Sequence, residues 1–97
     1  MYVQIITPEK TLFEGEVDSI NLPGTDGRFH ILNHHAAIVS SLKEGIIEVH
    51  THTQEFQDYQ NGNGKVQTSP LDDKILQFSI KGGVIEFNNN KAIVLAD

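Results

Sequence analysis

The 97-residue sequence contains no cysteine and no tryptophan, and it has a single methionine. Without cysteine the chain can form no disulfide, no thiolate zinc site and no cysteine nucleophile. Its core must therefore be built from isoleucine, leucine, valine and phenylalanine. A chain of this length forms one domain and buries roughly two-thirds of the surface exposed in its unfolded state, which is enough for one core.

Positive charge is also scarce, because seven lysine and arginine residues stand against thirteen acidic ones, giving a net charge of −6. These basic residues are scattered, whereas a surface that follows a phosphate backbone needs them clustered, so nucleic acid is not an expected partner. No apolar run is long enough to cross a bilayer. The first residues lack the basic region and apolar segment of a signal peptide, so we expect a cytosolic chain or one at the cytosolic face of a membrane.

Helical periodicity is absent as well, since apolar residues nowhere recur at helical spacing over a useful window. Short alternating runs separated by Gly, Pro and Asn turns indicate strands. The clearest runs are Val3–Ile5, Thr11–Glu14, Ile46–His52, Ile75–Ile80, Val84–Phe87 and Lys91–Leu95. The pattern predicts one all-β domain over residues 1–97, a flattened sandwich or barrel of two antiparallel sheets with about ten short strands.

Two regions depart from simple alternation. Phe13 and Val17 share one parity, but Ile20 and Leu22 take the other, which predicts a bulge near residues 18–19 or a strand that passes from one sheet to the other. Residues 53–74 hold few apolar side chains and two Asn-Gly turn signals. We expect either an extended loop at about 53–74 or a protruding hairpin that pairs Glu55–Gln60 with Lys65–Ser69; the hairpin is favoured because so long a structureless loop is unusual in a small domain.

The most informative stretch runs from Gly15 to Leu42. Its first strand stops at Pro23-Gly24, where proline has no N–H to donate and glycine can take positive φ. A glycine-bearing turn follows at Asp26-Gly27, and a His34-His35 corner precedes a second run of strand character. The combination predicts a rigid edge presented by short turns, with the rest of the chain as its scaffold.

The five histidines raise the alternative of a metal site. His50 and His52 would share one face of a strand. A third ligand would come from His30, His34, His35 or Glu48. No HExxH-like spacing supports such a site, and two histidines on a polar strand face are more often solvated, so we expect no metal and no cofactor. We also expect no catalysis, because Gly62-Asn63-Gly64-Lys65 lacks the context of a phosphate-binding loop and Asp72-Asp73 fits a solvated turn.

Three segments together resemble the N-terminal β-sandwich domain of the epsilon subunit of F-type ATP synthases. The segments are Leu12–Val17, the Leu22–Ala36 run, and Gly82–Phe87 with Asn90-Lys91 and Val94–Asp97. They cover most of the chain outside 53–74, and their order and spacing make the resemblance specific. The sequence departs from the family pattern where His30 replaces Gly, Asn33 replaces Pro and Ala37 replaces a second Pro.

The resemblance implies a non-catalytic rotor subunit that binds the gamma subunit and the membrane c-ring, and through them the alpha/beta hexamer. Such a subunit couples proton or sodium flow to ATP synthesis as a peripheral protein at the cytoplasmic face of the bacterial inner membrane, associated with the membrane only through the complex. The chain ends where the family's C-terminal helical hairpin begins, so inhibition of ATP hydrolysis by that hairpin is not expected.

The resemblance also implies residue roles. Residues expected at the c-ring interface are Asp26, Gly27, Arg28, His34 and His35, and those expected at structural turns are Pro23, Gly24, Gly82 and Gly83. The gamma-facing surface is expected on one sheet face and its strand edges. Two other functions remain open from the residues alone: a metal-dependent β-sandwich enzyme built on the histidines, and a generic protein- or carbohydrate-binding β module.

Overall fold

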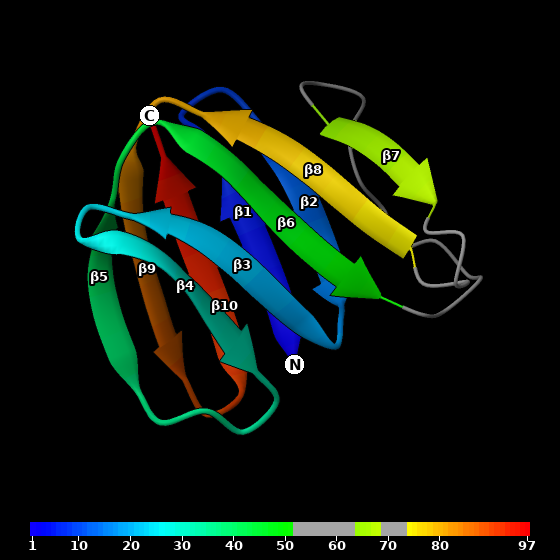
Figure 1. Ribbon diagram of the computed structural model, residues 1–97, viewed down its shortest axis with the longest axis vertical. Helices are drawn as coiled ribbons and strands as arrows, with labels where there is room; N and C mark the ends of the chain where they lie inside the picture. Colours follow the sequence, from blue (N-terminus) through cyan, green and yellow to red (C-terminus); the bar gives the residue numbers. More distant parts are fainter. Residues whose placement is uncertain (52–63, 69–73) are drawn as a thin grey trace.

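The structure, a computed structural model, describes residues 1–51, 64–68 and 74–97. These residues form ten strands (Figure 1). Their bounds are β1 Tyr2–Ile6, β2 Thr11–Glu16, β3 Ser19–Gly24, β4 Gly27–Leu32, β5 Ile38–Leu42, β6 Gly45–Thr51, β7 Gly64–Thr68, β8 Lys74–Ile80, β9 Gly83–Asn88 and β10 Lys91–Ala96. In this described part of the chain, no helix is long and apolar enough to cross a membrane.

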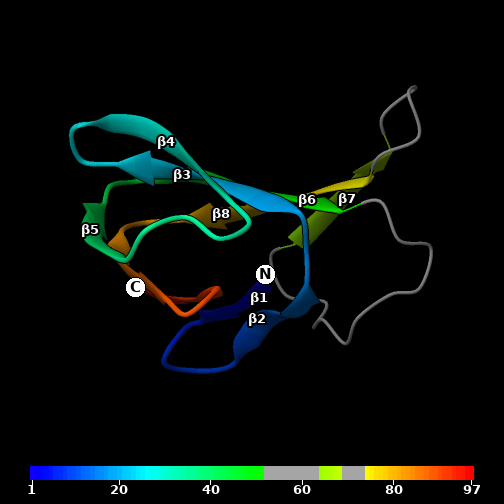
Figure 2. The ribbon, with the colours of Figure 1, turned by 90° about the horizontal axis from the view of Figure 1, so that it is seen from below.

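The strands form two layers that face each other (Figure 2). The first layer has the order β2-β1-β10-β9-β5, and the second has β4-β3-β6-β8-β7. One backbone pair, Gly24 of β3 with Leu42 of β5, joins the layers at a corner. The predicted all-β sandwich is confirmed. One detail differs, because β1 and β10 pair in parallel, whereas antiparallel pairing was expected throughout.

The chain crosses between layers immediately after β2. The amide of Val17 donates to the carbonyl oxygen of Met1 in the first layer at 2.8 Å, and the amide of Asp18 donates to that of His50 in the second layer at 2.9 Å. The parity slip in the sequence therefore marks a strand that changes sheets, which was one of the two predicted explanations. A separate irregularity in register lies between Ile5 and Ile6, where β1 meets β2.

The core fills the space between the layers with side chains of alternate strand positions. Those that are largest and fully buried include Phe13, Phe78, Phe87, Ile5, Ile20, Ile47 and Ile85. Burying each such side chain stabilises the fold by about 1.5–3 kcal/mol relative to leaving it exposed. Because both layers contribute, the two outer faces are left to solvent and to partners.

Glycine is required at two of the expected structural turns. A Cβ at Gly83, which has a φ of 150°, would lie 2.3 Å from the backbone oxygen of Leu95. A Cβ at Gly24 would lie 2.7 Å from the oxygen of Gly27 and 2.8 Å from the Phe29 ring. Neither position has room for a side chain, so the β8–β9 turn and the end of β3 are closely packed.

The predicted hairpin in the 53–74 region falls partly outside the described residues. β7 pairs in antiparallel fashion with β8, from Gly64 opposite Phe78 to Thr68 opposite Lys74. The expected partner, Glu55–Gln60, lies outside the described residues, so its pairing stays a prediction.

Candidate functional site

The outer face of the first layer carries a patch of aliphatic side chains, which we call the aliphatic face. It consists of Ile6, Val39, Val84, Ile93 and Leu95, from strands β1, β5, β9 and β10. The strand register brings them together, since Val84 lies opposite Leu95 and Leu95 lies beside Ile6. Val39 is 70% exposed and Leu95 is 52% exposed, so two large branched side chains of this face are open to solvent.

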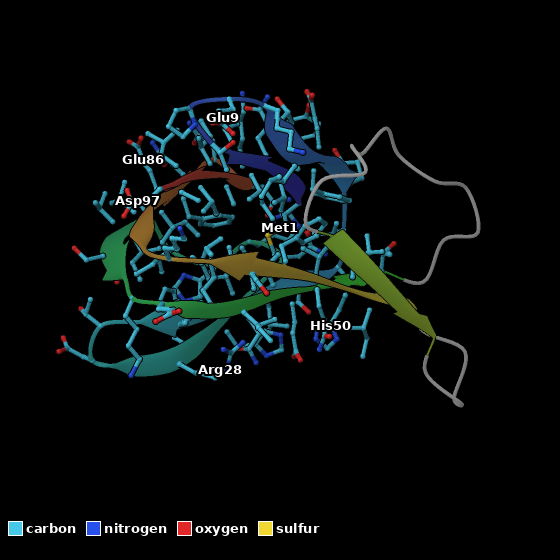
Figure 3. All side chains as sticks on the ribbon, turned by 90° about the horizontal axis from the view of Figure 1, so that it is seen from above. Met1, Glu9, Arg28, His50, Glu86 and Asp97 are labelled. Atoms are coloured by element: carbon cyan, nitrogen blue, oxygen red, sulfur yellow. The ribbon has the colours of Figure 1, made fainter. Side chains whose placement is uncertain are left out.

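Two carboxylates lie in one cross-strand row of the aliphatic face. Glu86 lies between Val39 and Ile93 in one cross-strand row and projects outward from the first layer (Figure 3). At the far end of the same row, Glu14 accepts a hydrogen bond from the Tyr2 hydroxyl. This hydrogen bond to Glu14, followed by partial burial, raises the pKa of Tyr2 to about 12. Glu86 therefore offers a partner an acceptor within the apolar patch, while Lys91 lies over the Tyr2 ring in the neighbouring row.

The first predicted corner, which we call the turn corner, consists of Asp26, Gly27 and Arg28. All three residues are exposed at the tight connection between β3 and β4. The Arg28 Nε donates to Asn21 Oδ1 at 3.0 Å, so the guanidinium is held along the outer face of the second layer. Figure 3 shows Arg28 on the side opposite Glu86.

The turn corner is also fixed to the neighbouring backbone. The amide of Thr25 donates to the oxygen of Ser41 at 3.1 Å, and the amide of Lys43 donates to that of Pro23 at 2.8 Å. These bonds tie the end of β3 and the first residue of the connection to β5 and to the β5–β6 turn. A docking surface that is already rigid loses little conformational entropy on binding.

The second predicted corner, which we call the histidine corner, consists of His34 and His35 in the connection from β4 to β5. His34 has a φ of 65°, and its amide donates to Asn90 Oδ1 at 2.7 Å. The His35 ring stands edge-on to buried Phe87 with centroids 6.1 Å apart, and its Nδ1 lies 2.7 Å from the oxygen of Ala36. Because a carbonyl oxygen only accepts, Nδ1 carries the proton in this contact.

The structure does not bring the two corners together. The turn corner lies at the start of β4 and the histidine corner follows its end. Six strand residues at about 3.3 Å each separate them by roughly 20 Å. The c-ring assignment of the five residues stays a prediction, and in this structure the two corners would meet a partner from different ends of β4.

The outer face of the second layer is mainly polar and holds the histidines of the metal hypothesis. His50 Nε2 lies 3.7 Å from Glu48 Oε1, and its ring centroid is 5.8 Å from that of His30. His52 lies outside the described residues. Within the described ranges, no group of three or more histidine, cysteine, aspartate or glutamate residues is arranged to hold a metal ion. The metal-dependent enzyme thus gains no support from this face.

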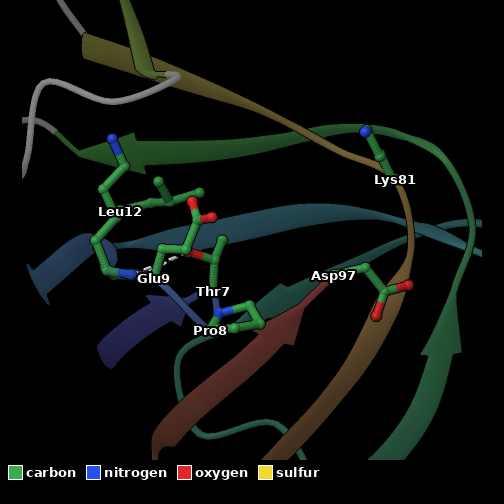
Figure 4. Close-up of a pocket in the computed structure, with 7 residues that line it drawn as sticks. Thr7, Pro8, Glu9, Leu12, Lys81 and Asp97 are labelled. Atoms are coloured by element: carbon green, nitrogen blue, oxygen red, sulfur yellow. Dashed lines mark hydrogen bonds between the residues drawn. The ribbon is translucent and has the colours of Figure 1, made fainter.

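A hollow of about 330 Å³ lies at the end of the sandwich between the β1–β2 turn and the chain's last residue (Figure 4). Its charged lining residues are Glu9, Lys10, Lys81 and Asp97. Because two cations and two carboxylates line it, the hollow favours neither an anion nor a cation. No catalytic constellation of the kinds considered from the sequence is assembled there.

The aliphatic face has a signal in the sequence, because two strands contain consecutive apolar residues instead of alternating ones. Residues 92–95 are apolar without interruption, and so are residues 84 and 85. A strand that is apolar on both sides is expected to be covered on both sides. The core covers only the inner side of β9 and β10. We therefore expect a partner to cover Val84 and Leu95 on the outer side.

The comparisons with known proteins agree with the fold. Residues 1–64 match the family model described as ATP synthase, Delta/Epsilon chain, beta-sandwich domain. An ATP synthase epsilon chain of Chlorobium limicola is 36% identical over 98% of this chain and 86% of its own length. One from Leptospira borgpetersenii serovar Hardjo-bovis is 35% identical over 98% of this chain, and here the chain spans 59% of the relative's length.

Solved structures show the same architecture. A chain of the Tetrahymena thermophila mitochondrial ATP synthase, in a structure of the central stalk and c-ring, aligns over 99% of this chain and 62% of its own length, with a TM-score of 0.68 and 18% identity. A chain of the Euglena gracilis mitochondrial ATP synthase aligns over 97% of this chain and 48% of its own, with a TM-score of 0.68 and 21% identity. The family model and the relatives establish that the chain belongs to the ATP synthase delta/epsilon family, through its β-sandwich domain.

Proposed function

We propose that the protein is a non-catalytic subunit of the central stalk of an F-type ATP synthase, where it binds the gamma subunit and the membrane c-ring. Its membership of the delta/epsilon family and its relatives named ATP synthase epsilon chain support this role. The subunit turns with the rotor and helps couple proton or sodium flow to ATP synthesis in the alpha/beta hexamer. It is peripheral, at the cytoplasmic face of the bacterial inner membrane, and reaches the membrane only through the complex.

The aliphatic face is the observation that carries the proposal. Monomeric proteins rarely leave contiguous aliphatic side chains open to water without a partner to cover them. Val39 and Leu95 are more than half exposed, and Val84, opposite Leu95, lies on the strand between theirs, while Glu86 separates Val39 from Ile93 in the neighbouring row. We assign this face to the gamma subunit, because a permanent stalk partner would bury a large apolar surface.

The turn corner suits the c-ring. It is exposed, lies away from the aliphatic face, and is fixed by backbone hydrogen bonds to β5 and the β5–β6 turn. Arg28 keeps guanidinium donors beyond those bound to Asn21, and these can bind carboxylates or carbonyl oxygens of the polar loops of the ring. The histidine corner, at the opposite end of β4 and next to the start of β5, is assigned with the aliphatic face to gamma.

A sandwich with these two contact regions can act as a coupling element without chemistry of its own. Torque passes from ring to gamma only if the connecting body is stiff, and the sheets, closely packed turns and buried core provide that stiffness. A generic carbohydrate- or protein-binding module would need no such pair of opposed contact regions, so we do not favour it.

The gamma assignment is tested by measuring the affinity of the purified chain for the gamma subunit of its own synthase. Val39→Asp places a carboxylate on the aliphatic face and should weaken binding by about thirtyfold or more, the loss typical of a central interface residue. Ile46→Asp is the matched control, because Ile46 is 41% exposed on a strand of the other layer. Equal affinity of both variants and wild type, or equal loss in both, would contradict the assignment.

A further inference from the structure

The histidine corner is fastened to the β9–β10 turn by two asparagine side chains, which we call the asparagine clasp. Asn90 Oδ1 accepts from the amide of His34 at 2.7 Å, and Asn90 Nδ2 donates to Asn33 Oδ1 at 3.4 Å. The α-ammonium of Met1 donates to the same Asn33 oxygen. A short polar chain thus links the start of β1, the β4–β5 connection and the β9–β10 turn, although Asn33 and Asn90 lie 57 residues apart in sequence.

The clasp lies at residues whose backbone adopts the left-handed conformation. His34 has a φ of 65°, and Asn89 and Asn90 have φ values of 51° and 58°. This left-handed conformation is uncommon for residues other than glycine, although asparagine and histidine adopt it more readily than most, and the side-chain hydrogen bonds add to its restraint at His34 and Asn90. Asn33, the residue before His34, is itself held by side-chain hydrogen bonds to Met1 and Asn90.

The position of the clasp gives it a functional consequence. Asn90 belongs to the turn between β9 and β10, the strands that carry Val84, Ile93 and Leu95 of the aliphatic face. The amide of Tyr2 also donates to the backbone oxygen of Asn90 at 3.1 Å, which anchors that turn to β1. The corner is therefore held directly by the strands that bear the aliphatic face, in addition to its own connection to β5.

We propose that Asn90 is a positioning residue that holds the histidine corner in register with the aliphatic face, so that a bound gamma subunit meets the two as one continuous surface. The proposal rests on the assignment of that face to gamma and adds a residue that does not itself contact the partner. Without the Asn90 side chain, the corner must be ordered when gamma binds, and the ordering cost weakens the complex.

Asn90→Gly and Asn89→Gly form a matched pair for the test. Both variants keep a residue that tolerates positive φ, so neither strains the turn. Only Asn90→Gly removes the acceptor of the His34 amide, because the Asn89 side chain is exposed and makes no hydrogen bond to any residue that the structure describes. Asn33→Ala, which removes the other half of the clasp, serves as a second variant.

Amide hydrogen exchange and gamma affinity give the two readouts. Losing one hydrogen bond should speed exchange of the His34 amide about five- to tenfold in Asn90→Gly and weaken gamma binding by a similar factor, while Asn89→Gly stays within about twofold of wild type. Asn33→Ala should change both readouts in the same direction as Asn90→Gly.

Two results would overturn the proposal. Unchanged His34 exchange in Asn90→Gly would mean that the clasp does not hold the corner. Faster exchange with unchanged gamma affinity would mean that the corner is no part of the gamma surface. The assignment of the aliphatic face to gamma is tested separately, with Val39→Asp. This substitution lies on β5, outside the clasp, so we expect it to leave the exchange of the His34 amide unchanged.

Discussion

The rings of Phe13 and Phe78 meet across the two layers with centroids 5.8 Å apart and planes tilted by 52°. Phe13 belongs to β2 of the first layer and Phe78 to β8 of the second, and both side chains are 1% exposed or less. Tilted aromatic pairs at this distance add attraction to that of the buried area. The pair therefore bridges the two layers within the core.

Replacing one ring of this pair by alanine should show how much the pair contributes to the stability of the sandwich. Phe78→Ala is expected to lower the free energy of unfolding by about 3–5 kcal/mol, because it loses apolar burial and leaves a cavity. Urea denaturation followed by circular dichroism gives the value. Ser79→Ala, at the next position of β8 and exposed, is the control and should change stability by no more than about 0.5 kcal/mol. Similar losses in the two variants would show that the layers do not pack around Phe78.

Two glycines allow backbone strain to be separated from steric overlap. Gly27 has a φ of 127° but open space where a Cβ would lie, whereas Gly83 has a φ of 150° and the oxygen of Leu95 at 2.3 Å. Gly27→Ala should therefore cost about 1–3 kcal/mol from conformation alone. Gly83→Ala should cost more, because the β8–β9 turn must also move away from β10. Thermal unfolding of both variants checks the order, and a larger loss at Gly27 would contradict it.

The strand pattern of this fold could be predicted from sequence because alternation and turn residues are local properties. The change of sheet after β2 was visible as a shift in the parity of Phe13 and Val17 against Ile20 and Leu22. The parallel pairing of β1 with β10 was not visible, since it joins the two ends of the chain. The clasp between Asn33 and Asn90 gave no signal for the same reason.

The candidate site was predicted in part. Both corners were predicted as exposed connections. Their distance from each other was not predicted, although the sequence places a strand between them. The run Phe29–Leu32 lies between them, and a strand necessarily places its two ends apart. The aliphatic face was missed because alternation was used to find the core, and outward apolar residues such as Val39 and Leu95 were not counted as a surface of their own.

Tyr2 gives the fold a pH dependence at the alkaline side. Its pKa is raised from the usual 10.0 to about 12, chiefly by the hydrogen bond to Glu14. A group whose pKa is higher in the folded state adds stability that is fully present below its unfolded pKa and is lost as the pH rises through the folded one. Stability should therefore fall between about pH 10 and pH 12 as tyrosinate forms beside the Glu14 carboxylate.

The Tyr2 prediction can be checked by ultraviolet titration. The chain has two tyrosines, so a Tyr59→Phe background leaves Tyr2 as the single chromophore of its kind. Glu14→Gln in that background should lower the pKa of Tyr2 toward 10, and Tyr2→Phe should remove its share of the alkaline loss of stability. A Tyr2 titration that is the same with and without Glu14 would contradict the assignment.

Arg28 tests the turn corner as a contact with the c-ring. Arg28→Glu reverses the charge at an exposed position whose guanidinium bonds only to Asn21 among the described residues, so the fold and the affinity for gamma should be preserved. Ion pumping driven by ATP hydrolysis in reconstituted vesicles should fall severalfold at unchanged hydrolysis rate, because a reversed charge leaves the polar groups of the ring without their partner. His30→Glu is the control, since His30 is exposed on the same strand two residues farther from the turn. Normal pumping with Arg28→Glu, or equal loss with both variants, would separate the turn corner from the ring and leave the aliphatic face and the histidine corner, both assigned to gamma, as the proposed contacts.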